Sequence, residues 1–137
     1  MLLAVPVPDR VARTRLPIPL RKPELFINNP QWQRFVESDP LSLRRVTWQF
    51  AREDRKLTRF ARNAPTYLHL PLLLILAGRD RIVHNRRTRT YFGRIASEHK
   101  TLLEYRDATH TLEFENERSR FFEDLVAWIK QFAPSSS

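Results

Sequence analysis

LLLILAGRDRIVHN, residues 72–85, changes character at its centre. Its first six residues are apolar on both alternating faces, which is typical of a strand in a parallel sheet that helices cover on each side. Gly78 then ends the strand, and Asp80 follows between two arginines. Asp80 is therefore predicted to lie just beyond the carboxyl end of a buried strand, where open parallel sheets gather their reactive groups.

The sequence after this stretch alternates helix, strand and helix. Asn85 is a favoured N-cap for a helix over residues 86–96, and residues 101–105 form a short strand that runs into the loop RDATHTLEFEN. A final helix, capped by Asn116, follows this loop. Its apolar face consists of Phe121, Phe122, Leu125, Trp128, Ile129 and Phe132.

The sequence before residue 72 predicts a strand end and two helices. LLAVPVP, residues 2–8, is typical of the last residues of a strand that prolines stop, and the proline-rich stretch up to Pro30 shows no periodicity. Asn29-Pro30 and Asp39-Pro40 each place a capping side chain before a proline, which predicts helices over residues 30–37 and 40–62. The second helix aligns Leu43, Val46, Phe50, Leu57 and Phe60 on one face.

Alternation of strands and helices predicts an α/β fold with about three parallel strands and helices on both faces. A sheet of three parallel strands is small, and the first strand begins as if cut from a longer one. We therefore expect the chain to be the end of a larger α/β domain.

The composition narrows the classes of function. With no cysteine among 137 residues there is no disulfide, thiolate metal site or cysteine nucleophile. The longest apolar runs are shorter than the roughly 20 residues that span a bilayer. We expect a soluble, cytoplasmic protein. The net charge of +9 permits binding to nucleic acid or anionic membranes. The arginines form no single cluster, so a solvated basic surface explains them better than a nucleic-acid site does, and we do not expect nucleic-acid binding.

Asp80 and His110 are the candidate catalytic residues. Each follows the end of a predicted strand, 30 positions apart, and adjacent parallel strands would bring their loops together. A carboxylate there can fix the tautomer of an imidazole, whose other nitrogen then takes a proton from a nucleophile. Taken singly, Asp80 also fits a turn residue and His110 a polar loop residue.

Three runs together resemble the C-terminal part of α/β-hydrolases, in particular the monoacylglycerol lipase and lysophospholipase-like branch. They are LPLLLILAGRDRIVHNRRTRTYFGRI, LLEYRDATHTLEFE and FFEDLVAWIKQF. The resemblance implies that Asp80 in GRD is the acid and His110 in ATH the histidine of a catalytic triad. It also implies that LLAVPVPDRV is the sixth strand with its exit loop and that NNPQWQRFVESDPLSLRRVTWQFARE is a helical lid inserted before the seventh strand.

The resemblance divides the chain into four parts. They are the end of a core strand with its exit loop (1–12), a lid-like helical insertion (13–66), the C-terminal strand-helix-strand-helix of the core (67–133) and a disordered tail (134–137). The aromatic residues Phe26, Trp32, Phe35, Trp48 and Phe50 of the lid either shape an acyl-chain pocket, as the resemblance implies, or pack the lid helices onto the body.

The nucleophile of this family is missing from the sequence. The family's serine lies in a G-x-S-x-G elbow, and the only two glycines, Gly78 and Gly93, are fifteen positions apart. Ser38, Ser42, Ser97 and Ser119 each fit a local capping or solvent role. We therefore expect a fragment that is inactive alone, either a truncated hydrolase or a separate small protein that kept the hydrolase ending.

The partners and cofactors follow from this interpretation. The substrate would be a small acyl ester once the enzyme is assembled, and the polypeptide partner would be the missing N-terminal half or a second copy of the chain. A contact between the lid and a membrane surface stays open. We expect no cofactor and no metal, because His69, His84, His99 and His110 are spread along the chain. The alternative is a non-enzymatic basic module that binds nucleic acid or anionic lipid.

Overall fold

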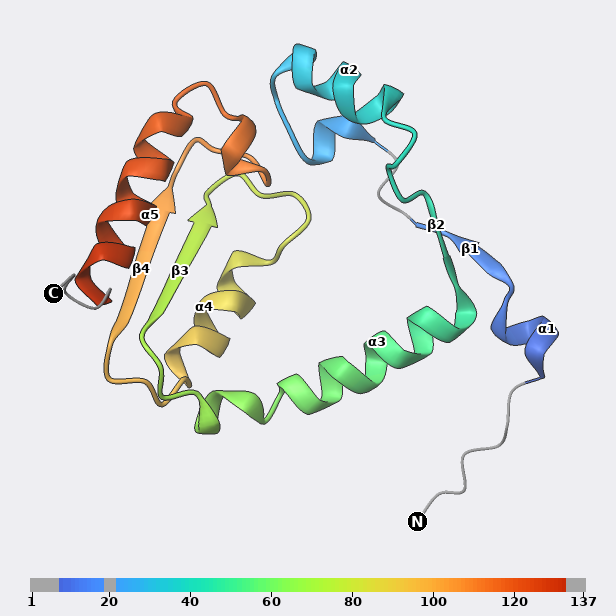
Figure 1. Cartoon of the computed structure of the whole chain (residues 1–137), viewed down its shortest axis with the longest axis horizontal. Coiled ribbons are helices and arrows are strands. Elements are labelled where there is room, and N and C mark those ends of the chain that lie inside the picture. The colour runs from blue at the N-terminus through green and yellow to red at the C-terminus, as the bar shows by residue number, and fades with distance from the viewer. Residues whose placement is uncertain (1–7, 19–21, 133–137) are drawn as a thin grey trace, which may run out of the picture.

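The body of the protein is built on a two-stranded parallel sheet. The structure, a computed structural model, describes residues 8–18 and 22–132. The two strands pair in register from Leu72 opposite Lys100 to Ala77 opposite Tyr105 (Figure 1). The elements of the body are β3 (Leu72–Ala77), α4 (Asn85–Gly93), β4 (Lys100–Tyr105), the 3-10 helix η3 (Leu112–Phe114) and α5 (Arg118–Phe132).

Helices α4 and α5 cover opposite faces of the sheet. The indole N–H of Trp128 in α5 donates to the hydroxyl of Thr101 at 3.2 Å. Arg89 in α4 forms an ion pair with Glu104 at 2.6 Å. Thr101 and Glu104 are three positions apart on β4 and so point to opposite sides of the sheet. The strand is therefore covered on each side, as the apolar run at 72–77 predicts (Figure 1).

The core is small, and part of it lies at the carboxyl ends of the strands. Leu76 and Ala77 at the end of β3 are buried, together with Ile95 and Ala108. Ile27, from the segment that leads into α2, is an apolar side chain that is also buried, with 1% of its surface exposed. Part of the core thus lies at the end of the sheet from which Asp80 and His110 emerge.

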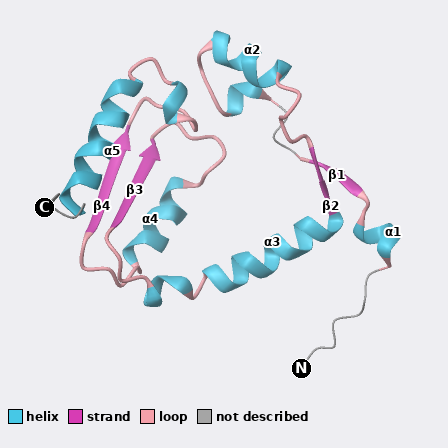
Figure 2. Cartoon of the chain, viewed as in Figure 1, coloured by secondary structure: helices cyan, strands magenta, loops and turns pink. Residues whose placement is uncertain are grey.

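The segments before β3 form an arm that leaves the body and returns to it. In Figure 1, α3 runs from the amino end of the sheet to β1 and β2, which pair antiparallel with Arg15 opposite Thr47, while α2 lies near the carboxyl ends of β3 and β4. Figure 2 shows the two separate strand pairs in magenta. The elements of the arm are α1 (Asp9–Ala12), β1 (Arg15–Pro17), η1 (Pro23–Leu25), α2 (Pro30–Ser38), β2 (Arg45–Thr47), α3 (Trp48–Ala61) and η2 (Ala64–Tyr67).

Helix α3 is attached to the body at its carboxyl end. The phenol of Tyr91 donates to the carbonyl of Ala61 at 2.7 Å, and the guanidinium of Arg94 donates to the carbonyl of Arg62 at 3.2 Å. These side chains of α4 and its C-cap satisfy carbonyls that a helix end leaves without partners. The apolar face of α3 is not buried by the described residues, because Phe50, Leu57 and Phe60 are all more than half exposed.

Several predicted elements are confirmed. Helix α2 covers residues 30–38, and the side chain of Asn29 accepts a hydrogen bond from the N–H of Gln31, as an N-cap does. Strands β3 and β4 lie within one residue of the predicted ranges, and the final helix is present. The predicted strand before Pro6 and the tail after residue 133 lie outside the described residues, so two of the three expected parallel strands are described here.

The predicted helix over residues 40–62 is wrong at its start. Helix α3 begins at Trp48, because residues 45–47 pair with residues 15–17 as an antiparallel ladder. The N-cap is Thr47, whose hydroxyl accepts from the N–H of Phe50 at 3.1 Å. Asp39 instead accepts from the N–H of Leu41, the local turn that a short acidic side chain favours. The proline-rich stretch up to Pro30, which shows no periodicity in the sequence, thus contains the strand β1.

Two predicted caps are also wrong. The amide of Asn85 donates to the carbonyl of Ala77 at 2.8 Å and so binds the end of β3, while His84 holds the N-cap position of α4 without a side-chain bond. Asn116 accepts from the side chain of Asn29 at 3.0 Å, and α5 begins at Arg118. Helix α4 ends at Gly93, three residues earlier than expected.

Gly78 is required by close approach, which gives a test of the packing. A Cβ at this position would lie 2.6 Å from the Cα of Arg106, a distance that real Cβ atoms do not show. We expect Gly78→Ala to lower the free energy of unfolding by about 1–3 kcal/mol in urea denaturation, because the backbone of β4 must move.

Gly93→Ala is the matched control, since a Cβ there meets nothing within 4 Å. It should leave the free energy of unfolding unchanged or raise it by up to about 1 kcal/mol. Equal losses from both substitutions would contradict the close approach at Gly78.

Candidate active site

The hydrogen bonds between β3 and β4 continue beyond the ends of the strands. The N–H of Gly78 donates to the carbonyl of Tyr105 at 2.8 Å, and the N–H of Arg79 donates to the carbonyl of Ala108 at 2.9 Å. These bonds join the two exit loops through their backbones. The loop that carries Asp80 is therefore held beside the loop that carries His110.

Both oxygens of Asp80 have partners. One oxygen accepts from the N–H groups of Ile82 and Val83 at 2.7 and 2.8 Å, and the other lies 2.9 Å from Nδ1 of His110. The carboxylate side chain is 7% exposed. A carboxylate held by two backbone donors cannot turn freely, so its second oxygen points steadily at the imidazole.

The environment of Asp80 favours its charged form. Burial is the largest influence and by itself would raise the pKa of the carboxyl group. The N–H of Val83, the His110 side chain and the N–H of Ile82 act in the opposite direction and together outweigh burial, so the pKa of Asp80 lies below its ordinary value. Asp80 is thus an anion at neutral pH and accepts the Nδ1 proton of His110.

His110 keeps one ring nitrogen for chemistry. Its side chain is 29% exposed, and its ring meets the ring of Phe26 edge to face, with centroids 5.8 Å apart. Nδ1 is engaged by Asp80, and no group of residues 8–18 or 22–132 hydrogen-bonds Nε2. A neutral imidazole with Nδ1 protonated presents a basic Nε2, the atom that removes a proton from a nucleophile.

The expectation that Asp80 and His110 meet is confirmed by their hydrogen bond, whereas their catalytic role stays a prediction. Sequence reasoning missed the residues that support His110. They are Thr109, Thr111 and Glu115 in the loop after β4, and the carbonyl of Phe26. The threonines on either side of His110 are visible in the sequence as the run T-H-T. The carbonyl of Phe26, which accepts from Thr111, lies 85 residues away from it, and no local sequence pattern indicates this contact.

The other candidate groups lie apart from this pair. The hydroxyls of Ser38, Ser42 and Ser97 donate to backbone carbonyls, as their predicted local roles require. Within the part of the chain that the structure describes, no three histidine or acidic side chains are grouped so as to hold a metal ion. His69, His84 and His99 are exposed.

The lid aromatics divide into two groups. The ring of Trp32 stacks on the ring of Phe114 in the loop that carries His110, with ring centroids 4.6 Å apart. This contact packs α2 onto the body. Phe35, Trp48 and Phe50 are exposed. Among the described helices none is long and apolar enough to cross a membrane.

The chain is similar to a known protein family and to solved structures. Residues 1–117 match the family described as serine aminopeptidase, S33. The chain belongs to this family. No curated protein sequence matches it.

Solved structures share the fold of this family member. The monoacylglycerol lipase of Paleococcus ferrophilus is 23% identical with a TM-score of 0.76, and the match covers 88% of this chain and 47% of that one. A soluble variant of the monoglyceride lipase of Saccharomyces cerevisiae, in complex with a substrate analogue, is 18% identical with a TM-score of 0.74, covering 90% of this chain and 46% of that one. The protein therefore has part of an α/β-hydrolase fold and spans about half the length of these lipases.

The hydrogen bonds of Asp80 predict a measurable contribution to stability. Asp80→Asn keeps an oxygen for the two backbone donors but loses the negative charge opposite His110. We expect a loss of about 1–3 kcal/mol in the free energy of unfolding at pH 7. Asp107→Asn is the control, because its side chain is 84% exposed and its ion pair with Arg79 should contribute less than about 1 kcal/mol.

The lowered pKa of Asp80 also predicts a pH dependence. A carboxyl group whose pKa is lower in the folded state stabilises the fold above its unfolded pKa of about 4, and this contribution is lost as the pH falls through the folded value. The difference in the free energy of unfolding between the unsubstituted protein and Asp80→Asn should therefore shrink as the pH falls below about 5. A difference that stays constant down to acid unfolding would show that the carboxylate gains nothing from its partners.

Proposed function

We propose that this chain supplies the acid and the general base of a serine ester hydrolase that resembles the lipases. The observation that carries the proposal is the 2.9 Å contact between Asp80 and Nδ1 of His110, at the carboxyl ends of two paired parallel strands. Membership of the serine aminopeptidase, S33, family and the lipase fold support it.

In the proposed reaction Nε2 of His110 takes the proton of a serine hydroxyl as the serine oxygen attacks the ester carbonyl. His110 then gives this proton to the departing alcohol, which leaves the acyl group on the serine oxygen. The same nitrogen later takes a proton from the water that attacks this acyl group and returns it to the serine oxygen as the acid departs. Asp80 holds the ring in the required tautomer and stabilises the imidazolium that forms in each step. The carboxylate itself stays ionised.

The serine and the oxyanion donors would come from polypeptide outside this chain. A G-x-S-x-G elbow needs glycines two positions either side of the serine, and Gly78 and Gly93 cannot form one. In such hydrolases the oxyanion donors include the backbone N–H after the nucleophile. This chain alone should therefore hydrolyse esters slowly or not at all.

The lid segment offers a place for the acyl group. Phe26, whose ring meets that of His110, also lines a cavity of about 260 Å³ in the lid. Most of the side chains that line this cavity are apolar, which suits a hydrocarbon chain better than a charged group. Its lining residues are Pro23, Phe26, Val36, Glu37, Ser42, Leu43 and Arg44. We propose that the substrate class is an acyl ester and that the lid binds its apolar part.

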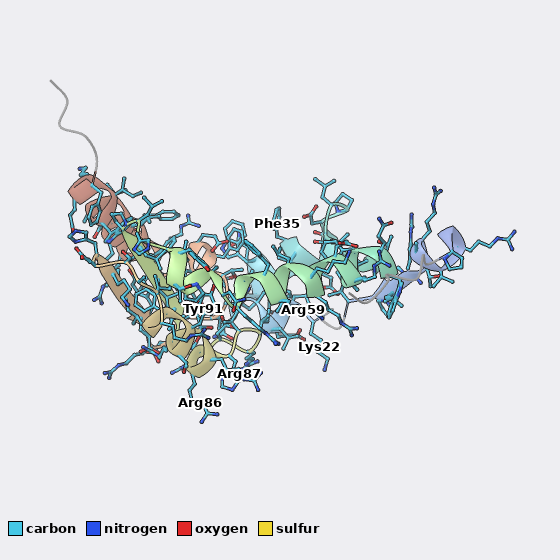
Figure 3. All side chains as sticks on the ribbon, turned by 90° about the horizontal axis from the view of Figure 1, so that it is seen from below. Lys22, Phe35, Arg59, Arg86, Arg87 and Tyr91 are labelled. Atoms are coloured by element: carbon cyan, nitrogen blue, oxygen red, sulfur yellow. The ribbon has the colours of Figure 1, made fainter. Side chains whose placement is uncertain are left out.

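A second candidate function rests on charge. Figure 3 shows Lys22, Arg86 and Arg87 projecting from one side of the molecule, and all three are exposed. Within the described residues none of them forms an ion pair. A basic face of this kind would bind nucleic acid or anionic lipid, and binding would weaken steeply with added salt. Titration with duplex DNA and with anionic vesicles at two salt concentrations separates this candidate from the hydrolase.

The nucleophile provides the first test of the hydrolase. A fluorophosphonate probe should leave this chain unlabelled, since no serine within residues 8–18 and 22–132 hydrogen-bonds His110. Labelling at any serine of the chain would overturn the account of the nucleophile. Reading the gene upstream of Met1 in frame should reveal a G-x-S-x-G roughly 80 to 120 residues earlier. A stop codon just before Met1 would count against it.

The general base provides the second test. In a polypeptide that joins this chain to its upstream elbow, His110→Ala should lower kcat for a short acyl ester by at least about 10²-fold, because proton transfer is lost. His99→Ala is the control, since His99 is exposed and lies at the opposite end of β4. Equal activity of the two variants would exclude His110 as the base.

A further inference from the structure

His110 lies between two threonines, and each threonine is held twice by a single acceptor. The N–H of Thr109 donates to Oε1 of Glu115 at 2.5 Å, and the Thr109 hydroxyl donates to the same oxygen. On the other side, the N–H and the hydroxyl of Thr111 donate to the carbonyl of Phe26 at 3.2 and 3.1 Å. The backbone is thus fixed immediately before and immediately after the histidine.

The clamp at Thr109 is buried and charge-assisted. Thr109 is 1% exposed, so water does not compete for its N–H or its hydroxyl. Glu115 is half-buried, and hydrogen bonds to an ionised carboxylate are shorter and stronger than those to a neutral acceptor. This carboxylate therefore holds Thr109, the residue before His110, by both its main chain and its side chain.

The clamp at Thr111 belongs to a different part of the chain. Phe26 follows η1, and its ring packs against the imidazole while its carbonyl holds Thr111. The same segment is tied to α2, because the amide of Gln33 donates to the carbonyl of Ile27 at 2.8 Å. The segment that leads into α2 and the loop after β4 therefore form one packed unit around His110 (Figure 1).

One hydrogen bond to Asp80 leaves an imidazole free to swing about its side-chain torsions. His110 sits in a loop, outside the helices and strands, and is 29% exposed. A misplacement of about 1 Å in a catalytic group can cost about 10²-fold in rate. The alignment of the ring consequently depends on how firmly its backbone is held.

We propose that Glu115 is a positioning residue for His110, acting through Thr109, and that the carbonyl of Phe26 is its counterpart through Thr111. The two clamps hold the imidazole in line with Asp80, and the second one makes this alignment depend on the lid segment. The inference deepens the proposed function. Its test uses the His110–Asp80 hydrogen bond itself and needs no catalysis.

The test is the Nδ1 proton of His110 in the ¹⁵N-labelled full chain, observed by nuclear magnetic resonance. Glu115→Ala removes the acceptor for Thr109, and we expect exchange of the Nδ1 proton with solvent to become at least about tenfold faster. Glu115→Gln keeps an acceptor oxygen and should restore most of the protection. Glu113→Ala is the matched control, because Glu113 is an exposed acid two positions away in the same loop.

The amide resonances of Gly78 and Tyr105 report whether the sheet is intact in each variant. Unchanged exchange in a folded Glu115→Ala variant would overturn the proposal. If Glu115→Ala fails to fold, Thr109→Val decides, because it removes only the hydroxyl donor and leaves the backbone bond to Glu115. Faster exchange in Thr109→Val supports the positioning role, and unchanged exchange overturns it.

The second clamp has its own substitution. Thr111→Val removes the hydroxyl donor to Phe26, and we expect weaker contacts between the Phe26 and His110 rings in nuclear Overhauser spectra, whereas Thr111→Ser should keep them. In the polypeptide that joins this chain to its upstream elbow, an Nδ1 proton that responds to these changes without any esterase activity would support the clamps while the proposed function fails. Loss of esterase activity without any change at Nδ1 would do the reverse.

Discussion

The arrangement of the site depends on the parallel pairing of β3 with β4 and on its continuation past the strand ends. At that point the N–H of Gly78 reaches the carbonyl of Tyr105, and the backbone of Arg106 comes so near that only a glycine fits. Side chains do not make this contact. Main-chain hydrogen bonds hold together two loops that are far apart along the chain. Asp80 and His110 therefore lie within hydrogen-bonding distance of each other.

The sequence was sufficient for the elements that are decided by local pattern. β3 could be predicted from an unbroken apolar run, and Asp80 and His110 could be paired because each follows a strand and parallel strands end at the same edge of a sheet. The cap at Asn29 was also predictable, because the Asn-Pro pair satisfies a helix start by itself. In these cases the deciding interactions lie within a few residues of one another.

Where the deciding interaction is distant, local pattern failed. Residues 45–47 are not part of the expected helix because they pair as a strand with residues 15–17. A pairing between residues this far apart in the chain cannot be predicted from a window of ten residues. Asn85 and Asn116 look like caps, yet their side chains bind Ala77 and Asn29. The clamps on either side of His110 illustrate both cases: Glu115 lies close in sequence, whereas the carbonyl of Phe26 is supplied by a segment 85 residues away.

The use of main-chain groups at Gly78 has an evolutionary consequence. Backbone hydrogen bonds place few demands on the side chains around them, so loops held in this way can accumulate substitutions while their spacing is preserved. The chain superimposes on a lipase with a TM-score of 0.76 although only 23% of the aligned residues are identical. Substitutions are tolerated where a fold is tied by its peptide groups, whereas at Gly78 there is no room for a side chain and a substitution must move the backbone of Arg106.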